Sequence, residues 1–247
     1  MKTIYSQTPE ELGKKAAQHT AKLLRQYIEK NGCARLLLST GASQLTTINA
    51  LLEEPVDWEK VEMFHLDEYI DLPRDHPASF IKYLQERFVD KVPLGKVHFV
   101  DTSGDVNEMI TRLTQEIRKS PIDVGLIGIG ENAHIAFNDP PADFDSDEAF
   151  IIVTLAESCR RQQLGEGWFK TLEDVPAQAV TMTVRQILKC RHIISAVPFK
   201  VKAKAIYDTL TAPDITPMIP STILRNHDDV TVYADKDSSS MLDDSFK

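Results

Sequence analysis

Residues 34–52, with the sequence ARLLLSTGASQLTTINALL, decide the fold class. A short apolar run at 34–38 leads through a turn of small polar residues into a helical stretch that begins near Leu45. A buried strand that passes at once into a helix is the repeating unit of parallel α/β sheets. The segment therefore predicts one strand–turn–helix unit, and the flanking sequence has to supply its neighbours.

The same alternation continues on both sides of this unit. A first helix is expected to begin after Thr8, which can cap it ahead of Pro9 and Glu11, and to end at Asn31 and Gly32. Short apolar runs predict further buried strands at 61–66, 97–100, 123–130, 192–197 and 230–234. Helical stretches are expected at 78–90, 105–119, 183–190, 200–210 and 236–242. The pattern predicts an α/β fold with a doubly wound, mostly parallel sheet and helices on both faces, a Rossmann-like three-layer sandwich.

Composition narrows the class of protein. Of 247 residues, 42% are hydrophobic and 26% charged, which excludes disordered and collagen-like chains. The net charge of −9 argues against nucleic acid or an anionic membrane as partner. Residues 1–15 turn charged too early for a signal peptide, and the uncharged stretch 36–52 is too polar to span a membrane. The three cysteines lack CxxC spacing, as expected of reduced thiols in a cytoplasmic protein. No linker divides the sequence, so we expect one domain over residues 1–247.

Three predicted strand ends carry unusual residues, and open α/β sheets bind ligands at the carboxyl ends of their strands. The first is STGASQ at 39–44. Its small residues let a ligand approach the backbone, while the following helix start and the hydroxyls of Thr40 and Ser43 offer donors to an anion. The alternative is a plain strand–helix turn that Ser43 caps. The missing Gly-Lys-Ser/Thr excludes a Walker A loop.

The second strand end is FHLDEY at 64–69. The adjacent carboxylates of Asp67 and Glu68 suggest a buried base beside a surface charge, because burial raises a carboxyl pKa towards the range useful for proton transfer. The alternative is a solvated strand end. His65 and Asp67 would lack a third ligand at suitable spacing, so no metal is predicted.

The third strand end is GIGENAHIAFNDPP at 128–141. Its GxGxxA pattern formally matches a dinucleotide-binding fingerprint. However, it lies mid-chain and meets two prolines too soon for the long helix of that motif, so a nicotinamide-dependent dehydrogenase is disfavoured. His134, five residues before Asp139, could relay a proton in a fixed tautomer. A purely structural histidine is an equal alternative.

Together these segments resemble the glucosamine-6-phosphate deaminase family, within the group that includes 6-phosphogluconolactonases. The resemblance covers nearly the whole chain and is carried, in order, by LSTGASQLTTINAL, FHLDEYIDLPRDHPASF, LIGIGENAHIAFNDPP, AVTMTVRQIL and PSTILRNHDDVTVYAD. Lactonases usually have Asp-Glu-Arg and a Gly-His-Thr-type segment. This chain has Asp67-Glu68-Tyr69 and His134 followed by Ile-Ala-Phe-Asn, which favours the deaminase side.

The resemblance implies a reaction without metal or organic cofactor. An amino sugar phosphate would become a ketose phosphate with release of ammonia. His134, oriented by Asp139, would move a proton to the ring oxygen, and Asp67 would carry a proton between C2 and C1. Asn132 occupies a catalytic position that many relatives fill with Asp, and Asp139 is one methylene shorter than the usual Glu.

The resemblance also implies how the substrate is held. Lys202 would supply the countercharge to the phosphate, and four loop residues would hold the phosphate or nearby hydroxyls: Thr40, Gly41, Ala42 and Ser43. The family's Arg-Phe-Phe segment appears here as residues 167–169 without its Arg, so Arg160 or Arg161 is expected to replace it. Ala133 stands where Gly is usual, and its methyl group is expected to crowd the substrate.

These departures gather around the sugar, which makes galactosamine 6-phosphate an alternative substrate. Two further alternatives are a 6-phosphogluconolactonase and a sugar-phosphate-binding regulator without catalysis, the second suggested by Asn132 and Ala133. A phosphorylated amino sugar is the expected ligand. A homo-oligomer is possible, because the family includes monomers and hexamers.

Overall fold

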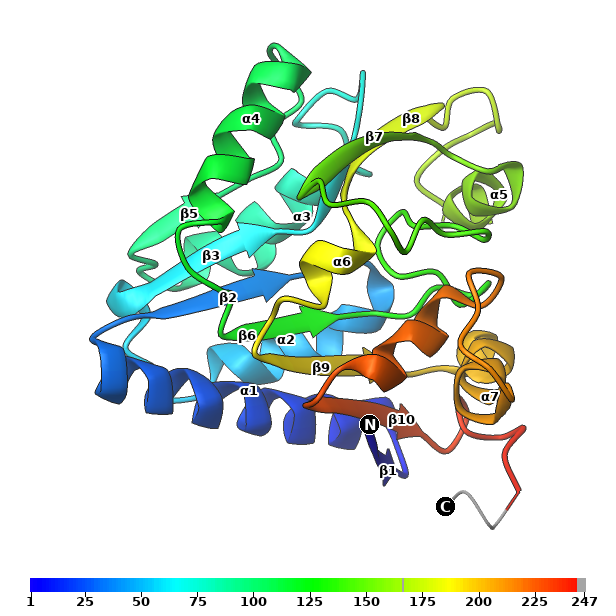
Figure 1. Cartoon of the computed structure of the whole chain (residues 1–247), viewed down its shortest axis with the longest axis horizontal. Helices are drawn as coiled ribbons and strands as arrows, with labels where there is room; N and C mark the ends of the chain where they lie inside the picture. The colour runs from blue at the N-terminus through cyan, green and yellow to red at the C-terminus, as the bar shows by residue number, and fades with distance from the viewer. Residues whose placement is uncertain (166, 244–247) are drawn as a thin grey trace.

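The computed structural model describes residues 1–165 and 167–243 and is built around a seven-stranded sheet (Figure 1). The strand order is β1-β10-β9-β6-β2-β3-β5, and each neighbouring pair is parallel. These strands are β1 (Lys2–Ser6), β2 (Ala34–Leu38), β3 (Val61–His65), β5 (Lys96–His98), β6 (Val124–Ile127), β9 (His192–Val197) and β10 (Val230–Asp235). The expected α/β fold with a mostly parallel sheet is confirmed.

Helices cover both faces of this sheet, because successive strand residues face opposite sides. Leu36 and Leu38 pack under α1 (Pro9–Asn31), α2 (Leu45–Leu52) and α3 (Phe80–Arg87). Leu37 packs on the other face, against residues of α4 (Val106–Ile117), α6 (Val184–Ile187) and α7 (Ala203–Thr211). Figure 1 shows α1 and α4 on opposite sides of the strands. The result is the predicted three-layer arrangement.

The first helix has the predicted ends. Thr8 has extended backbone and its hydroxyl accepts a hydrogen bond from the Glu11 amide at 3.2 Å. Gly32 closes the helix in the left-handed conformation, with φ of +79°, and its amide donates to the Ile28 carbonyl. Local cap chemistry therefore determines both boundaries.

A second, three-stranded antiparallel sheet was not predicted. It consists of β4 (Asp67–Tyr69), β8 (Gln178–Met182) and β7 (Phe150–Thr154), in that order, with α5 (Glu157–Gly165) between β7 and β8 in sequence. The chain leaves the large sheet at His65 and enters the small one at Asp67, with Leu66 alone between them. Asp67 is thereby placed at the junction of the two sheets.

Some sequence predictions were wrong in extent. The segment 236–242 forms turns instead of a helix, because the buried Asp235 carboxylate accepts a hydrogen bond from the Ser238 amide and its carbonyl accepts one from the Ser239 hydroxyl. The expected helix at 183–190 is reduced to the four residues of α6, and β6 ends at Ile127, before the glycines. Strand β1 was also missed.

Candidate active site

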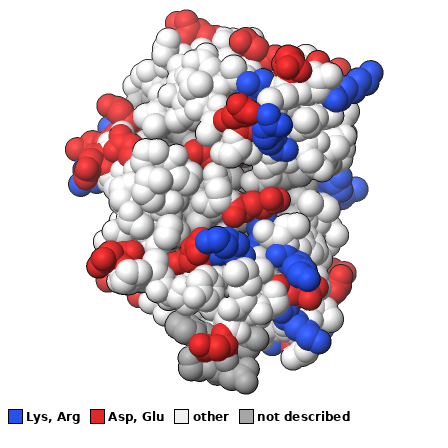
Figure 2. All heavy atoms as spheres, turned by 90° about the vertical axis from the view of Figure 1, so that its right-hand side faces the viewer, with Lys and Arg blue, Asp and Glu red and all other residues white. Residues whose placement is uncertain are grey.

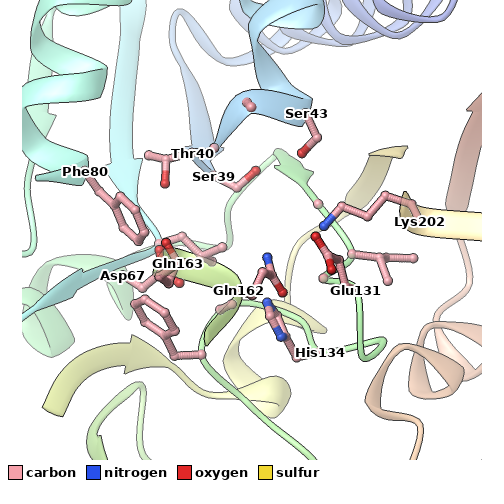
Figure 3. A pocket seen from close by; sticks show the side chains of 18 of the residues that line it. Ser39, Thr40, Ser43, Asp67, Phe80, Glu131, His134, Gln162, Gln163 and Lys202 are labelled. Carbon is pink, nitrogen blue, oxygen red and sulfur yellow. The ribbon is translucent and has the colours of Figure 1, made fainter. Parts of the chain in front are cut away.

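The carboxyl ends of β2, β3 and β6 meet at one edge of the large sheet, and the three singled-out segments converge there on one cavity. Figure 3 shows the side chains of Asp67, His134 and Lys202 directed into it. The cavity has a volume of about 180 Å³ and opens to solvent. The lining residues include Ser39, Thr40, Gly41, Ala42, Ser43, Leu66, Asp67, Phe80, Gly128, Ile129, Gly130, Glu131, His134, Ala136, Phe137, Gln162, Gln163, Phe199, Val201 and Lys202.

Asp67 is a buried carboxyl group that reaches this cavity. It begins β4 opposite Thr181 of β8 and is 5% exposed. Removal from water, together with the nearby charge of Glu68, raises its pKa to about 8. An acid with a pKa near neutrality can both take up and release a proton at small cost. The alternative of a solvated strand end is therefore wrong for Asp67.

Glu68 corrects the expectation of a surface charge, because it too is buried. Its carboxylate accepts hydrogen bonds from the Ser79 hydroxyl at 3.0 Å, the Ile81 amide at 2.7 Å and the Tyr69 amide at 2.9 Å. Burial raises the pKa of Glu68 to about 7, although these donors oppose the rise. Glu68 thus fastens β4 to the start of α3 and holds the neighbouring Asp67 in place.

His134 lies in the loop after β6 and is kept there by its neighbours. The amide of Gly130 donates to the His134 carbonyl at 2.9 Å, and the side-chain oxygen of Asn132 accepts from the His134 amide at 3.1 Å. The His134 ring covers Gly130 so closely that a Cβ atom there would lie 2.2 Å from the ring atoms Cε1 and Nε2. Gly130 is thus required for the position of the imidazole.

Asp139 lies behind the histidine. Its Oδ1 is 3.2 Å from His134 Nδ1 and accepts a hydrogen bond from Asn132 Nδ2 at 3.0 Å. Burial works to raise the pKa of Asp139, but the contacts with His134 and Asn132 outweigh it and keep the pKa below its usual value. The structure therefore brings the predicted trio of His134, Asp139 and Asn132 together, with the carboxylate ionised next to the ring.

The methyl group of Ala133 does not crowd the cavity, so that expectation was wrong. Ala133 is buried in the hydrophobic core and does not line the site. Its backbone has φ of +65°, a region that glycine adopts at lower cost. The cost of replacing the usual Gly falls on the backbone, away from any ligand.

The loop at 39–44 contributes backbone and hydroxyl groups to the cavity. Gly41 has φ of +102°, and its carbonyl accepts a hydrogen bond from the Tyr83 hydroxyl at 2.9 Å. Ser43 does not cap α2: its Oγ accepts from Gln44 Nε2 at 3.1 Å, and no side chain caps that helix. The capped-turn alternative is therefore wrong, and the Ser43 hydroxyl lies on the cavity side near Lys202 (Figure 3).

Arg160 lies elsewhere. Its Nη2 donates to the carbonyl of Leu172 and, at 3.0 Å, to that of Val175. Arg161 is exposed and pairs with Glu157 on the same helix. The structure places neither guanidinium among the cavity residues, because these local acceptors hold both groups.

Several lining residues were not predicted. Gln162 and Gln163 reach the cavity from α5, where Gln163 accepts a hydrogen bond from the Tyr69 hydroxyl at 2.7 Å. No sequence pattern marks them. Glu131 precedes the predicted trio and could have been included with it. Phe199 has φ of +81°, and such backbone strain in a bulky residue becomes visible only in a structure.

The charge distribution on the surface and the apolar character of the helices are relevant to binding of nucleic acid and of membranes. On the face in Figure 2, which includes the right-hand side of Figure 1, Lys and Arg are interspersed with Asp and Glu. Among the described residues, no helix combines the length and apolar character needed to cross a membrane.

Comparisons with known proteins identify the family of the chain. The family model for glucosamine-6-phosphate isomerases/6-phosphogluconolactonase matches residues 7–233. Glucosamine-6-phosphate deaminase of Exiguobacterium sibiricum is 34% identical, over 100% of this chain and 95% of its own. The enzyme of that name from Shouchella clausii is also 34% identical, covering 98% and 97%.

Solved structures give the same result. A monomeric glucosamine-6-phosphate deaminase superposes with a TM-score of 0.89 at 30% identity, over 98% of this chain and 100% of the other. A 6-phosphogluconolactonase from Thermotoga maritima reaches 0.77 at 19% identity, over 95% and 100%. The second similarity extends to the fold alone.

Proposed function

The chain belongs to the family of glucosamine-6-phosphate isomerases and 6-phosphogluconolactonases, and we propose that it isomerises and deaminates an amino sugar 6-phosphate. Glucosamine 6-phosphate and water would give fructose 6-phosphate and ammonia. The observation that supports this most is the shared cavity of Asp67 and His134, a buried acid and an imidazole with a carboxylate behind it. Proton transfer is the chemistry that this pair can perform.

Ring opening is the task of His134. Its imidazole delivers a proton to the ring oxygen while the C1 hydroxyl loses one, and the negative charge of Asp139 at 3.2 Å stabilises the protonated ring. Asn132 holds Asp139 by its hydrogen bond at 3.0 Å. The product of this step is the open-chain aldehyde.

Isomerisation follows at Asp67. The ionised carboxylate removes the proton from C2 and returns it to C1, which moves the double bond through an enolamine to a C2 imine. Water adds to the imine and ammonia leaves. The raised pKa of Asp67 makes the carboxylate a stronger base than an exposed one.

The opposite side of the cavity suits the phosphate. Lys202 offers a positive charge, and the Ser43 hydroxyl and the backbone around Gly41 offer hydrogen-bond donors near the start of α2. Since Arg160 is held by the carbonyls of Leu172 and Val175, we expect Lys202 to supply the main countercharge.

The preferred epimer forms part of the proposal. Residues 40–43, Glu131, Gln162 and Gln163 line the cavity together with the proton-transfer pair, and we expect them to contact the sugar hydroxyls. We expect glucosamine 6-phosphate as substrate, with galactosamine 6-phosphate as the alternative. We also propose that the enzyme is cytoplasmic. Light scattering of the purified protein measures whether it forms a homo-oligomer.

The test is an ammonia assay with both epimers, in parallel with Asp67→Asn. The variant should lose turnover while binding phosphosugar within a few-fold of the parent, because it removes the base and little binding. Normal turnover by the variant would refute the role of Asp67. No ammonia from either epimer would refute deamination, and acid release from a gluconolactone 6-phosphate would then indicate a lactonase.

A further inference from the structure

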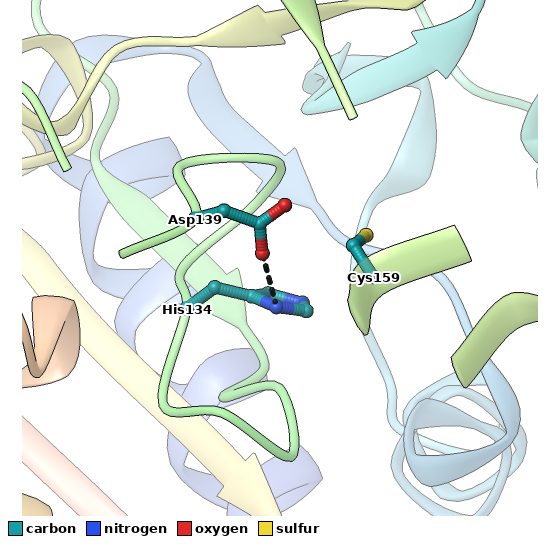
Figure 4. A group of neighbouring side chains, drawn as sticks. All are labelled: His134, Asp139 and Cys159. Carbon is teal, nitrogen blue, oxygen red and sulfur yellow. Dashed lines mark ion pairs between the residues drawn. The ribbon is translucent and has the colours of Figure 1, made fainter. Parts of the chain in front are cut away.

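A thiol lies next to the His134–Asp139 pair. Cys159, in α5, is buried, and one ligand atom from each of the three side chains lies within 4.8 Å of the other two (Figure 4). His134 and Asp139 belong to the loop after β6, whereas Cys159 comes from the helix between β7 and β8. The tertiary fold therefore brings the Cys159 thiol next to a nitrogen and an oxygen donor that lie 25 and 20 residues before it in the sequence.

Two donor atoms of this cluster are unsatisfied within the described chain. Nδ1 of His134 is 3.2 Å from Asp139 Oδ1, yet the direction is not that of a hydrogen bond. Among residues 1–165 and 167–243, neither His134 Nδ1 nor Asp139 Oδ2 has a hydrogen-bond partner, although both atoms are buried. A buried polar atom without a partner is destabilising, and a cation between the side chains would satisfy both atoms.

The three donors are those that Zn²⁺ prefers. Imidazole nitrogen, carboxylate oxygen and thiolate bind zinc at about 2.0–2.3 Å, and three protein ligands leave a fourth position open. Tetrahedral coordination at such bond lengths separates the donors by about 3.5 Å. Donors already within 4.8 Å of one another need to approach by only about 1 Å to reach this separation.

A second cluster of potential ligands shows why this one stands out. Glu62, His98 and Glu116 also have ligand atoms within 4.8 Å of one another. However, Arg35 lies 2.8 Å from Glu62 and Lys96 lies 3.4 Å from Glu116, so protein cations already neutralise these carboxylates. In the described part of the chain, the ion-pair contact of Asp139 is with His134.

We propose that His134, Asp139 and Cys159 form an inhibitory zinc site. Zn²⁺ would bind His134 at Nδ1 and draw Asp139 and Cys159 towards it. The metallated ring would carry its proton on Nε2 and could no longer exchange protons with the sugar. The inhibition rests on the proposed function, whereas metal binding does not.

Metal binding is tested with Co²⁺, which substitutes for Zn²⁺ in its binding sites. A thiolate ligand gives bound Co²⁺ an absorption band in the near ultraviolet. The full-length protein carries Cys33→Ser, because Cys33 is exposed. One Co²⁺ per chain should produce the thiolate band, Zn²⁺ should abolish it, and adding Cys159→Ala should remove it. A missing band, or one that persists without Cys159, would overturn the proposal.

Inhibition is tested in the same backgrounds by ammonia release. Zn²⁺ should inhibit the Cys33→Ser protein, and EDTA should reverse the effect. Adding Cys159→Ala should raise the half-inhibitory concentration at least tenfold, whereas equal inhibition would refute the site. If Cys159→Ala fails to fold, Asp139→Asn replaces it, and its affinity for Co²⁺ is measured in place of inhibition. An unchanged affinity would overturn the proposal. A cobalt band without any ammonia release would separate failure of the proposed function from failure of the metal site.

Discussion

Gly130 offers the sharpest test of the position of His134. A Cβ atom at residue 130 would lie 2.2 Å from Cε1 and Nε2 of the imidazole and 2.5 Å from Cδ2. Ordinary contact between such atoms needs about 3.5 Å, so in Gly130→Ala the ring has to move by roughly 1 Å or more. A displacement of that size at a reacting group costs about 10²-fold in rate, equivalent to about 2.7 kcal/mol.

The assay is steady-state ammonia release from the preferred epimer. We expect kcat to fall about 100-fold in Gly130→Ala, while the far-ultraviolet circular dichroism stays that of the parent. Gly165→Ala is the matched control, because a Cβ at Gly165 meets no atom of the described residues within 4 Å apart from its chain neighbours, and its backbone does not require glycine. A kcat within threefold of the parent in Gly130→Ala would show that His134 has no fixed role in the reaction.

Three further predictions concern other parts of the site. Because the pKa of Asp67 is raised to about 8 and the base must be ionised, kcat/KM should fall about tenfold per pH unit below pH 8 and level off above it; a flat profile from pH 6 to 8 would contradict this. Ala133→Gly should relieve the strain at φ of +65°, adding up to about 1 kcal/mol to the free energy of unfolding in urea without lowering kcat. Lys202→Met should raise KM for the phosphosugar about 10–100-fold with kcat within a few-fold, since it removes a charge-assisted contact; an unchanged KM would place the phosphate elsewhere.

Periodicity and cap chemistry predicted much of the large sheet. Strand β2 and strand β9 have the expected bounds, and the first helix has the expected ends. These are buried parallel strands and a well-capped helix, whose signals are local. Strands β7 and β8 were missed, although the apolar run FIIVT of β7 is similar to the runs that predicted the other strands; their pairing in a separate antiparallel sheet joins segments that are distant in sequence. The last predicted helix failed because the buried Asp235 side chain organises turns there.

The sequence by itself determined which chemistry the site contains. It placed Asp67, His134 and the loop at 40–43 after three apolar runs, and parallel strands bring such ends to one edge of a sheet. A glycine, an acid and an imidazole at those points are properties of the chain that folding does not alter.

Only the tertiary structure decided what those groups can do. Burial raises the pKa of Asp67, and this burial depends on the small sheet, in which β4 pairs with β8. The exclusion of Arg160 from the cavity depends on carbonyl groups 12 and 15 residues away. The thiol beside His134 depends on where α5 packs. Solvation, pairing and distance are set by elements far apart in sequence, and a local pattern carries no record of them.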